Sequence, residues 1–231
     1  MPEMTFATAD GEMGGYVALP AATPAPVILV IQEIFGVNGF MRATCDELAA
    51  QGYVAACPDL FWRMEPGVQL TDQTEADWAR AFDFFGRFDV DKGVEDLTAA
   101  LTTLRQHPAG NGKVGSVGYC LGGKLAYLMA TRSDSDCNVS YYGVQIDQLL
   151  DEAGKIAKPL LMHVAEKDEF VPPEAQAAMK AVLAGLPPVT FESYPGCDHA
   201  FARVGGAHYQ AAAAAKANGL SAAFFKDNLG G

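Results

Sequence analysis

Short apolar segments alternate with amphipathic segments along most of this 231-residue chain. Residues 26–32 form a largely apolar run, typical of a strand buried on both faces of a sheet, and residues 38–52 have the spacing of a helix that ends at Gly52. Strands that alternate with helices build a parallel sheet covered by helices. The sequence therefore predicts an α/β fold, in which residues 1–231 form a single domain with a mostly parallel central sheet and helices on both faces.

The same pattern continues to the end of the chain. Further strands are expected at 53–57, 113–117, 138–142, 159–165 and 189–194, and further helices at 72–86, 89–107, 124–132, 172–186 and 211–225. In sheets of this kind, ligands bind in the crevice beyond the carboxyl ends of the strands. Reactive residues that directly follow a strand are therefore the candidates for a functional site.

Charge and cysteine content exclude several classes of function. The net charge is −12 without a lysine or arginine cluster, which argues against nucleic acid and anionic membranes as partners. No apolar run approaches the roughly 20 residues needed to cross a bilayer, and the first residues do not resemble an export signal. Five cysteines without a C-x-x-C pair indicate neither a disulfide framework nor a zinc site. We expect a cytoplasmic protein without metal or cofactor, either a monomer or a small homo-oligomer.

The segment "GYCLGG" (118–123) follows an expected strand and precedes an expected helix. Its frame, G-x-C-x-G, matches the nucleophile elbow of the α/β-hydrolases, with cysteine at the position of the usual serine. Gly118 and Gly122 provide the small residues that such a sharp turn requires, and the start of the helix favours a thiolate. Cys120 is therefore the predicted nucleophile. The alternative is a buried, unreactive cysteine, the fate expected of Cys45, Cys57 and Cys137.

A base and an acid are expected after later strands, because the triad of this fold runs in the order nucleophile, acid, histidine. His199 follows the last predicted strand and is the candidate base. Asp168 follows the strand at 159–165 and is preferred as the acid over Glu166 and Glu169, which read as solvated turn residues. His163, inside a strand, is expected to be structural.

The loop after the first buried strand adds a further carboxylate and a backbone donor. Glu33 lies at the same predicted crevice edge as Cys120. The amides of Ile34 and Leu121 are the expected oxyanion hole, since this fold takes one donor from this loop and one from the residue after the nucleophile.

Several motifs together resemble the dienelactone hydrolase (carboxymethylenebutenolidase) family. They are "QEIFGVN", "CPDL", "NGKVGSVGYCLGG", "YYGV", "KDEFVPP" and "HAFAR". The resemblance implies a cofactor-free hydrolase that opens the lactone ring of a dienelactone to maleylacetate. It implies the triad Cys120, Asp168 and His199, and a Glu33 that takes the thiol proton only when substrate is bound. A thiolate formed in this way is protected from oxidation.

A carboxylate-bearing substrate needs a cation in the pocket. Arg203, four residues after His199, is the expected contact, on one face if the stretch is helical; a surface salt bridge is the alternative. The family has a second arginine in the helix after "CPDL", where the gap-free register gives Trp78. Arg80 lies two residues further, on the opposite face of a helix, but is kept as a candidate.

Trp78 would favour a less anionic or more aromatic ester unless it only packs in the core. Phe35, Phe82, Tyr141 and Tyr142 are further candidates for pocket walls. Two other functions remain open at this point: a broader ester or thioester hydrolase with another natural substrate, and a non-catalytic protein that only binds a small lactone or ester.

Overall fold

A computed structural model describes residues 3–230 and contains one eight-stranded sheet. The strand order is β1-β2-β4-β3-β5-β6-β7-β8. The strands from β4 to β8 in this order are parallel, whereas β1 and β2 pair antiparallel. The strands are β1 (Glu3–Thr8), β2 (Gly11–Ala18), β3 (Ala25–Ile31), β4 (Val54–Pro58), β5 (Gly110–Tyr119), β6 (Asn138–Tyr141), β7 (Leu160–Ala165) and β8 (Val189–Tyr194). The predicted α/β fold with a mostly parallel sheet is confirmed.

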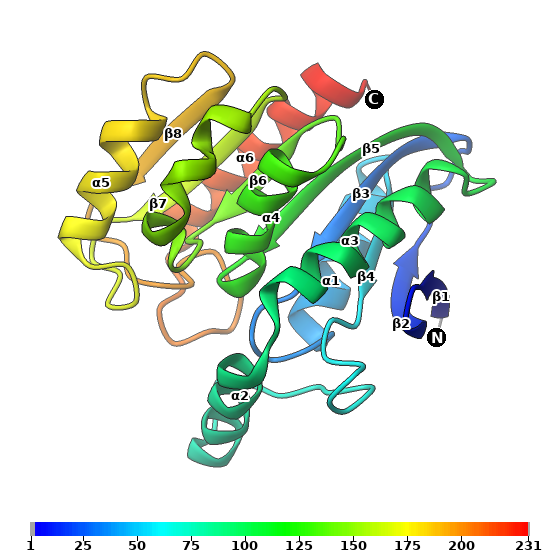
Figure 1. Cartoon of the computed structure of the whole chain (residues 1–231), viewed down its shortest axis with the longest axis horizontal. Helices are drawn as coiled ribbons and strands as arrows, with labels where there is room; N and C mark the ends of the chain where they lie inside the picture. Colours follow the sequence, from blue (N-terminus) through cyan, green and yellow to red (C-terminus); the bar gives the residue numbers. More distant parts are fainter. Residues whose placement is uncertain (1–2, 231) are drawn as a thin grey trace.

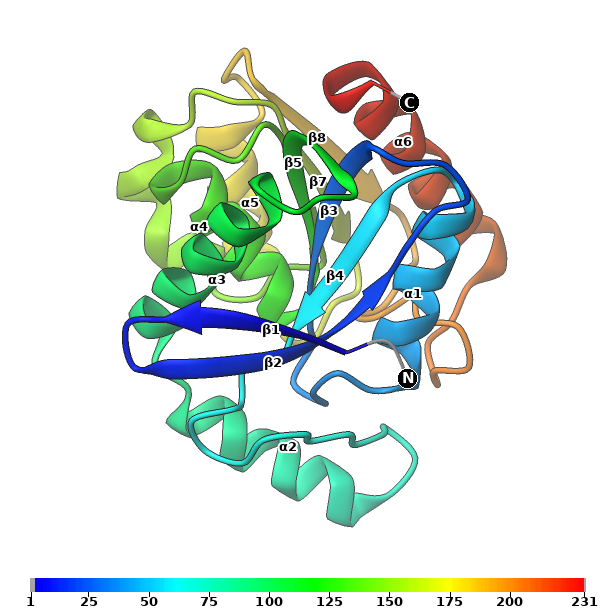
Figure 2. The same cartoon turned by 90° about the vertical axis from the view of Figure 1, so that its right-hand side faces the viewer.

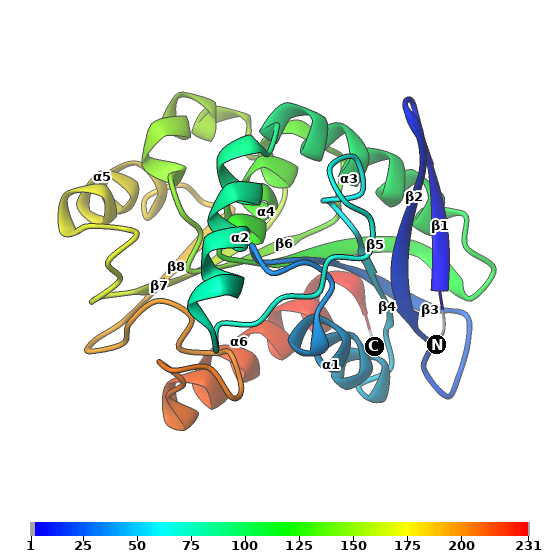
Figure 3. The same cartoon turned by 90° about the horizontal axis from the view of Figure 1, so that it is seen from below.

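Helices cover both faces of this sheet (Figures 1 and 3). Helices α1 and α6 lie on one face, and α3, α4 and α5 lie on the other (Figure 3). The helices are α1 (Gly39–Ala50), α2 (Glu75–Arg87), α3 (Val90–Arg105), α4 (Leu121–Arg132), η1 (Ile146–Lys155), α5 (Pro173–Leu183) and α6 (Ala211–Leu229). The first three begin at side-chain caps that the sequence supplies, Asn38, Thr74 and Asp89. No helix within residues 3–230 has the length and apolar character to span a bilayer.

The N-terminal hairpin of β1 and β2 is missing from the sequence-based prediction. Phe6 and Met13 pair across the two strands and are fully buried, so the hairpin contributes to the core. Its two loop residues are Ala9 and Asp10, and Gly11 pairs with Thr8 as the first residue of β2. Few apolar residues alternate around this turn, which is why the strand pattern was weak.

The sheet brings distant loops together at its carboxyl edge. Strands β3 and β5 are neighbours with Ile31 opposite Gly118, so the loops that follow them lie side by side. Strands β7 and β8 are also neighbours, with Ala165 opposite Tyr194. Helix α2 projects from the layers at the end of the molecule where β4 ends (Figures 1 and 2). The crevice at this edge receives its side chains from these loops and from α2.

Candidate active site

The turn between β5 and α4 holds Cys120 in an unusual backbone conformation, with φ 57° and ψ −113°. A non-glycine residue at positive φ costs about 1–3 kcal/mol and persists only where the surroundings enforce it. A Cβ atom on Gly118 would come within 1.9 Å of the Gly122 carbonyl oxygen, and one on Gly122 within 2.2 Å of the Ile31 oxygen. The glycine frame is thus required by close backbone contacts, and the predicted strained elbow is confirmed.

Asp168 and His199 form a buried pair. The ring Nδ1 of His199 donates to Asp168 Oδ2 at 2.7 Å, and the other carboxylate oxygen accepts from the Phe170 amide at 2.9 Å. Both side chains are buried, whereas Glu166 and Glu169 are exposed. Two hydrogen bonds fix the Asp168 carboxylate, which in turn fixes the imidazole and leaves Nε2 free to face the sulfur.

The charge of His199 is set by its neighbours. Burial opposes the charged ring, but the Cys120 sulfur and the Asp168 carboxylate outweigh it and raise the pKa of His199 to about 10. The ring also has a hydrogen bond to Cys120. The imidazolium is therefore the favoured form whenever the sulfur carries a negative charge, and it can then stabilise the thiolate and donate a proton.

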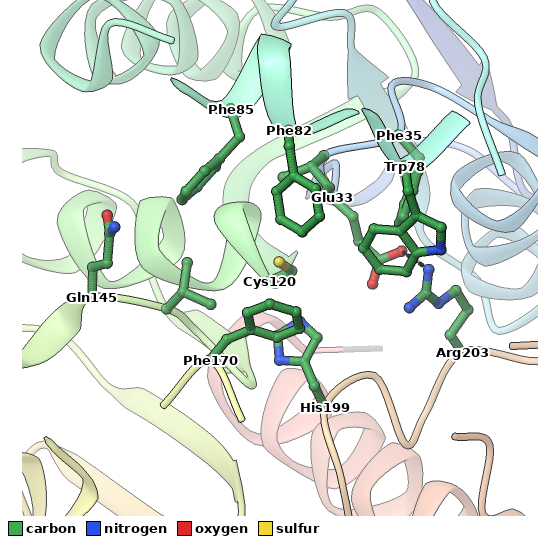
Figure 4. Close-up of a pocket in the computed structure, with 12 residues that line it drawn as sticks. Glu33, Phe35, Trp78, Phe82, Phe85, Cys120, Gln145, Phe170, His199 and Arg203 are labelled. Carbon is green, nitrogen blue, oxygen red and sulfur yellow. Dashed lines mark ion pairs between the residues drawn. The ribbon is translucent and has the colours of Figure 1, made fainter. Parts of the chain in front are cut away.

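Glu33 and Arg203 meet on the other side of the sulfur (Figure 4). Arg203 Nη1 lies 3.6 Å from Glu33 Oε2 and also 3.6 Å from Asp72 Oδ2. Both Glu33 oxygens and Arg203 Nε lack a hydrogen-bond partner among the described residues, although all three atoms are buried. Burial raises the pKa of Glu33, an effect that Arg203 opposes. Figure 4 shows the Glu33 carboxylate turned towards Arg203.

The two predicted oxyanion donors lie in the expected places. Ile34 is in the loop after β3, and Leu121 is the first residue of α4. Within the described chain, neither amide donates a hydrogen bond to another residue. Gly36 (φ +75°) lets this loop pass against Val68, whose carbonyl oxygen a Cβ atom would approach to 2.0 Å. This contact fixes the loop that carries Glu33 and Ile34.

A pocket opens above Cys120, with mostly apolar walls that include several aromatic rings (Figure 4). It is lined by Glu33, Ile34, Phe35, Trp78, Phe82, Phe85, Cys120, Val144, Gln145, Phe170, His199 and Arg203. The ring of Trp78 meets Phe35 edge-on at 5.0 Å and stacks on Phe82 at 5.4 Å. The expectation that Trp78, Phe35 and Phe82 form pocket walls is confirmed. Arg203 lines the same pocket and is not a surface residue.

Three expectations about the surroundings of the pocket are corrected. Arg80 is half exposed and pairs with Glu65 at 2.8 Å, because it lies on the outer face of α2. Tyr142 is buried behind the pocket, with its ring edge-on to His199 at 5.1 Å, and does not line it. Tyr141 points to the other face of the sheet, where its hydroxyl contacts α6.

The stretch that carries His199 and Arg203 is a series of turns and not a helix. The Arg203 amide donates to the Ala200 carbonyl oxygen at 2.9 Å, and Ala200 itself has a positive φ of 61°. Both functional side chains nevertheless reach the pocket. Among residues 3–230, no group of three or more histidine, cysteine or acidic side chains has an arrangement suited to a metal ion.

The protein-family comparison matches residues 13–229 to the model described as the dienelactone hydrolase family. The chain belongs to this family. A relative from Azospirillum brasilense, named "Putative carboxymethylenebutenolidase", is 55% identical over 225 residues, which is 96% of each chain. The carboxymethylenebutenolidase of Pseudomonas putida is 43% identical over 90% of this chain and 89% of its own.

The fold of the dienelactone hydrolases is also found among solved structures. A crystal structure from Klebsiella pneumoniae named "Putative Dienelactone Hydrolase" superposes with a TM-score of 0.86 at 25% identity, covering 96% of both chains. The family membership and the fold therefore agree with the resemblance of the motifs.

Four residues that line the pocket of this dienelactone hydrolase family member were absent from the sequence-based candidates, namely Phe85, Val144, Gln145 and Phe170. Phe85 lies three and seven positions after Phe82 and Trp78, a spacing that places all three on one face of α2, so the pattern contained this signal. Phe170 lies two residues after Asp168 in the motif "KDEFVPP", so its place beside the acid could also have been predicted. Asp72 does not line the pocket but pairs with Arg203. No sequence pattern indicated this ion pair, because it depends on how two distant loops pack.

Proposed function

We propose that this protein is a cysteine hydrolase that opens the lactone ring of a small, carboxylate-bearing dienelactone to maleylacetate through a thioester. The observation that carries the proposal is the strained Cys120 beside an imidazole that a buried carboxylate holds. The family comparison supports the substrate class, since the relative from Pseudomonas putida is named a carboxymethylenebutenolidase.

The first step is activation of the thiol. Substrate carboxylate binds Arg203, and Glu33 leaves this cation and takes the proton of Cys120. The unpartnered Glu33 oxygens and its raised pKa support this role, because a buried carboxylate without hydrogen bonds has a strong affinity for a proton. The charged His199 then stabilises the thiolate by its charge.

The second step forms the thioester. The thiolate attacks the lactone carbonyl carbon, and the amides of Ile34 and Leu121 stabilise the oxyanion. The ring C–O bond breaks as the C–S bond remains, and His199 donates its proton to the leaving enolate oxygen. The resulting enol tautomerises to the ketone of maleylacetate. An enolate is a good leaving group, so a thiolate suffices without the strong base that serine requires.

The third step restores the enzyme. Neutral His199 removes a proton from water, and the hydroxide attacks the thioester carbonyl. The C–S bond breaks, the carboxylic acid is released, and Glu33 returns its proton to the sulfur. Asp168 stabilises the imidazolium that forms again.

The test is the release of maleylacetate from cis- and trans-dienelactone, compared with the hydrolysis of 4-nitrophenyl acetate. Cys120→Ala should abolish both reactions, and intact-protein mass spectrometry should detect an acyl adduct on the wild-type protein but not on this variant. Cys197→Ala is the matched control, because Cys197 is also a buried free thiol but does not line the pocket. Turnover by Cys120→Ala at the wild-type rate would contradict the mechanism.

A broader ester or thioester hydrolase is the second candidate, and Trp78 in the pocket favours it. The Trp78 ring occupies the position at which the family pattern has an arginine. Activity on 4-nitrophenyl acetate without activity on either lactone would support this alternative. Tight binding of esters without any turnover would instead support a non-catalytic member of the family.

A further inference from the structure

Arg203 lies between two carboxylates and not one. Its Nη1 atom is 3.6 Å from Glu33 on one side and 3.6 Å from Asp72 on the other. All three side chains are 9% exposed or less. The buried cluster therefore contains two acidic groups for a single cation, and Glu33 is the one that the proposed function requires to move.

The position of Asp72 is fixed by its own loop. Its Oδ1 atom accepts a hydrogen bond from the Gln73 side-chain amide at 2.5 Å, which leaves Oδ2 directed at Arg203. Its carbonyl oxygen accepts the Trp78 indole N–H at 3.0 Å, so the loop is tied to α2. Asp72 can thus remain beside Arg203 when Glu33 turns away.

The charge balance explains what this second carboxylate does. When Glu33 turns towards Cys120, Arg203 would become a buried cation without a counter-ion, which is costly. A carboxylate-bearing substrate supplies a new counter-ion, but an uncharged ester does not. Asp72 supplies one in every case, and its negative charge also contributes to the raised pKa of Glu33.

We propose that Asp72 is a positioning residue that replaces the substrate carboxylate at Arg203, so that the protein also hydrolyses uncharged esters and lactones. This inference rests on the proposed function, because it assumes that Glu33 takes the thiol proton. The aromatic face of α2 fits the same substrates. Trp78, Phe82 and Phe85 present rings and no charge to the pocket, which suits a planar or apolar substituent.

The experiment compares two substrates that differ in one charge. 4-Nitrophenyl hydrogen succinate carries a carboxylate, whereas its methyl ester is uncharged and releases the same 4-nitrophenolate. Asp72→Asn keeps the size and the backbone contact with Trp78 but removes the charge. We expect kcat for the uncharged ester to fall about tenfold or more, with kcat for the anionic ester unchanged and its KM lower. Asp72→Glu should restore activity on the uncharged ester.

Asp83→Asn is the matched control, since it removes the same charge from the exposed surface of α2, where Asp83 forms an ion pair with Arg87 away from the pocket. It should leave both substrates unaffected. If Asp72→Asn lowers kcat equally for both esters, or leaves the ratio of the two kcat values unchanged, the role of Asp72 is overturned. If Cys120→Ala also keeps its turnover, the proposed function fails as well; if that variant is inactive, only the inference about Asp72 fails.

A second measurement does not depend on turnover. Iodoacetamide and iodoacetate alkylate a thiolate, and only iodoacetate brings a carboxylate. The rate of Cys120 labelling, measured by peptide mass spectrometry, should fall about tenfold with iodoacetamide in Asp72→Asn and remain near the wild-type value with iodoacetate. Equal slowing by both reagents would contradict the proposal.

Discussion

Two histidines occupy buried sites, one in the pocket at the carboxyl edge of the sheet and one inside strand β7, yet only one is suited to chemistry. His199 is 4% exposed and His163 is fully buried. Each packs against one of two consecutive tyrosines at the end of β6: His199 contacts Tyr142, and His163 contacts Tyr141. Burial and aromatic neighbours are therefore nearly the same in the two sites.

The polar partners differ. His199 donates to the Asp168 carboxylate and lies beside the Cys120 sulfur, whereas His163 contacts two hydroxyl groups, Ser221 at 2.9 Å and Tyr194 at 2.8 Å. Burial lowers the pKa of His163 to about 3, and its hydroxyl partners do not restore it. The comparison teaches that a neighbouring negative charge, and not the degree of burial, decides whether a buried imidazole is charged.

The strongest test of this comparison exchanges each histidine for glutamine. His199→Gln should lower kcat on the order of 10⁴-fold, because the pocket loses its proton donor and base. His163→Gln should leave kcat of the folded protein within about twofold and lower the free energy of unfolding by about 1–3 kcal/mol through its broken hydrogen bonds. Ester kinetics and urea unfolding measure both effects. A large loss of kcat in folded His163→Gln would break the comparison.

The partners of the two rings give the next test. Asp168→Asn should lower kcat on the order of 10³-fold, because the imidazolium loses the carboxylate that stabilises it. Ser221→Ala removes the partner of both His163 and Tyr141, and should lower the free energy of unfolding by about 1–3 kcal/mol with kcat retained. Similar losses of activity in the two variants would contradict the assignment of separate roles.

The dependence of stability on pH should have opposite signs at the two sites. His163 titrates near pH 6.5 when unfolded and near pH 3 when folded, so its contribution destabilises the protein as the pH falls from 6.5 towards 3. The pKa of His199 is raised to about 10, so its contribution is complete below pH 6.5 and is lost as the pH rises towards 10. The free energy of unfolding in urea should be measured across pH for the wild type and for each glutamine variant. The difference between the wild type and a variant should show the pH dependence described for that histidine. A variant that keeps this pH dependence would refute the assignment.

The smallest expected effects concern two tyrosine hydroxyls. Tyr194→Phe leaves His163 Nδ1 buried without its partner and should lower the free energy of unfolding by about 1–3 kcal/mol. Tyr142 has a buried hydroxyl without a partner among residues 3–230, so Tyr142→Phe should change the free energy of unfolding by less than about 0.5 kcal/mol. Thermal and urea unfolding of both variants provide the measurement, and equal losses would contradict the difference between the sites.

Much of the site could be predicted because its signals are local. The glycine frame of Cys120 is recognisable within a few residues of the sequence, although one of the contacts that require it comes from the end of β3, and the order of nucleophile, acid and base follows from the order of the strands. The structural role of His163 could be predicted for the same reason, since it lies inside an apolar strand. Each of these inferences needed only the chain around the residue and the general plan of a parallel sheet.

Other features could not be predicted because they depend on packing between distant segments. Asp72 meets Arg203 only when the loop before α2 lies against the turns after β8. Tyr142 had a suitable side chain, but the end of β6 directs it away from the pocket, whereas the outward position of Arg80 on α2 agrees with the helical spacing of the sequence. The N-terminal hairpin was missed because its burial comes from pairing with β4 and from its contribution to the core.

The sequence by itself determined the parallel α/β architecture, the strained cysteine turn and the chain order of acid and histidine, because periodicity and steric limits act over short distances. Only the tertiary structure decided the charges of the buried groups. The folded chain surrounds His199 with negative charge and His163 with hydroxyls, and it encloses Arg203 between two carboxylates. Electrostatic interactions depend on distance in space and on desolvation, and neither quantity is encoded in the neighbouring residues of the chain.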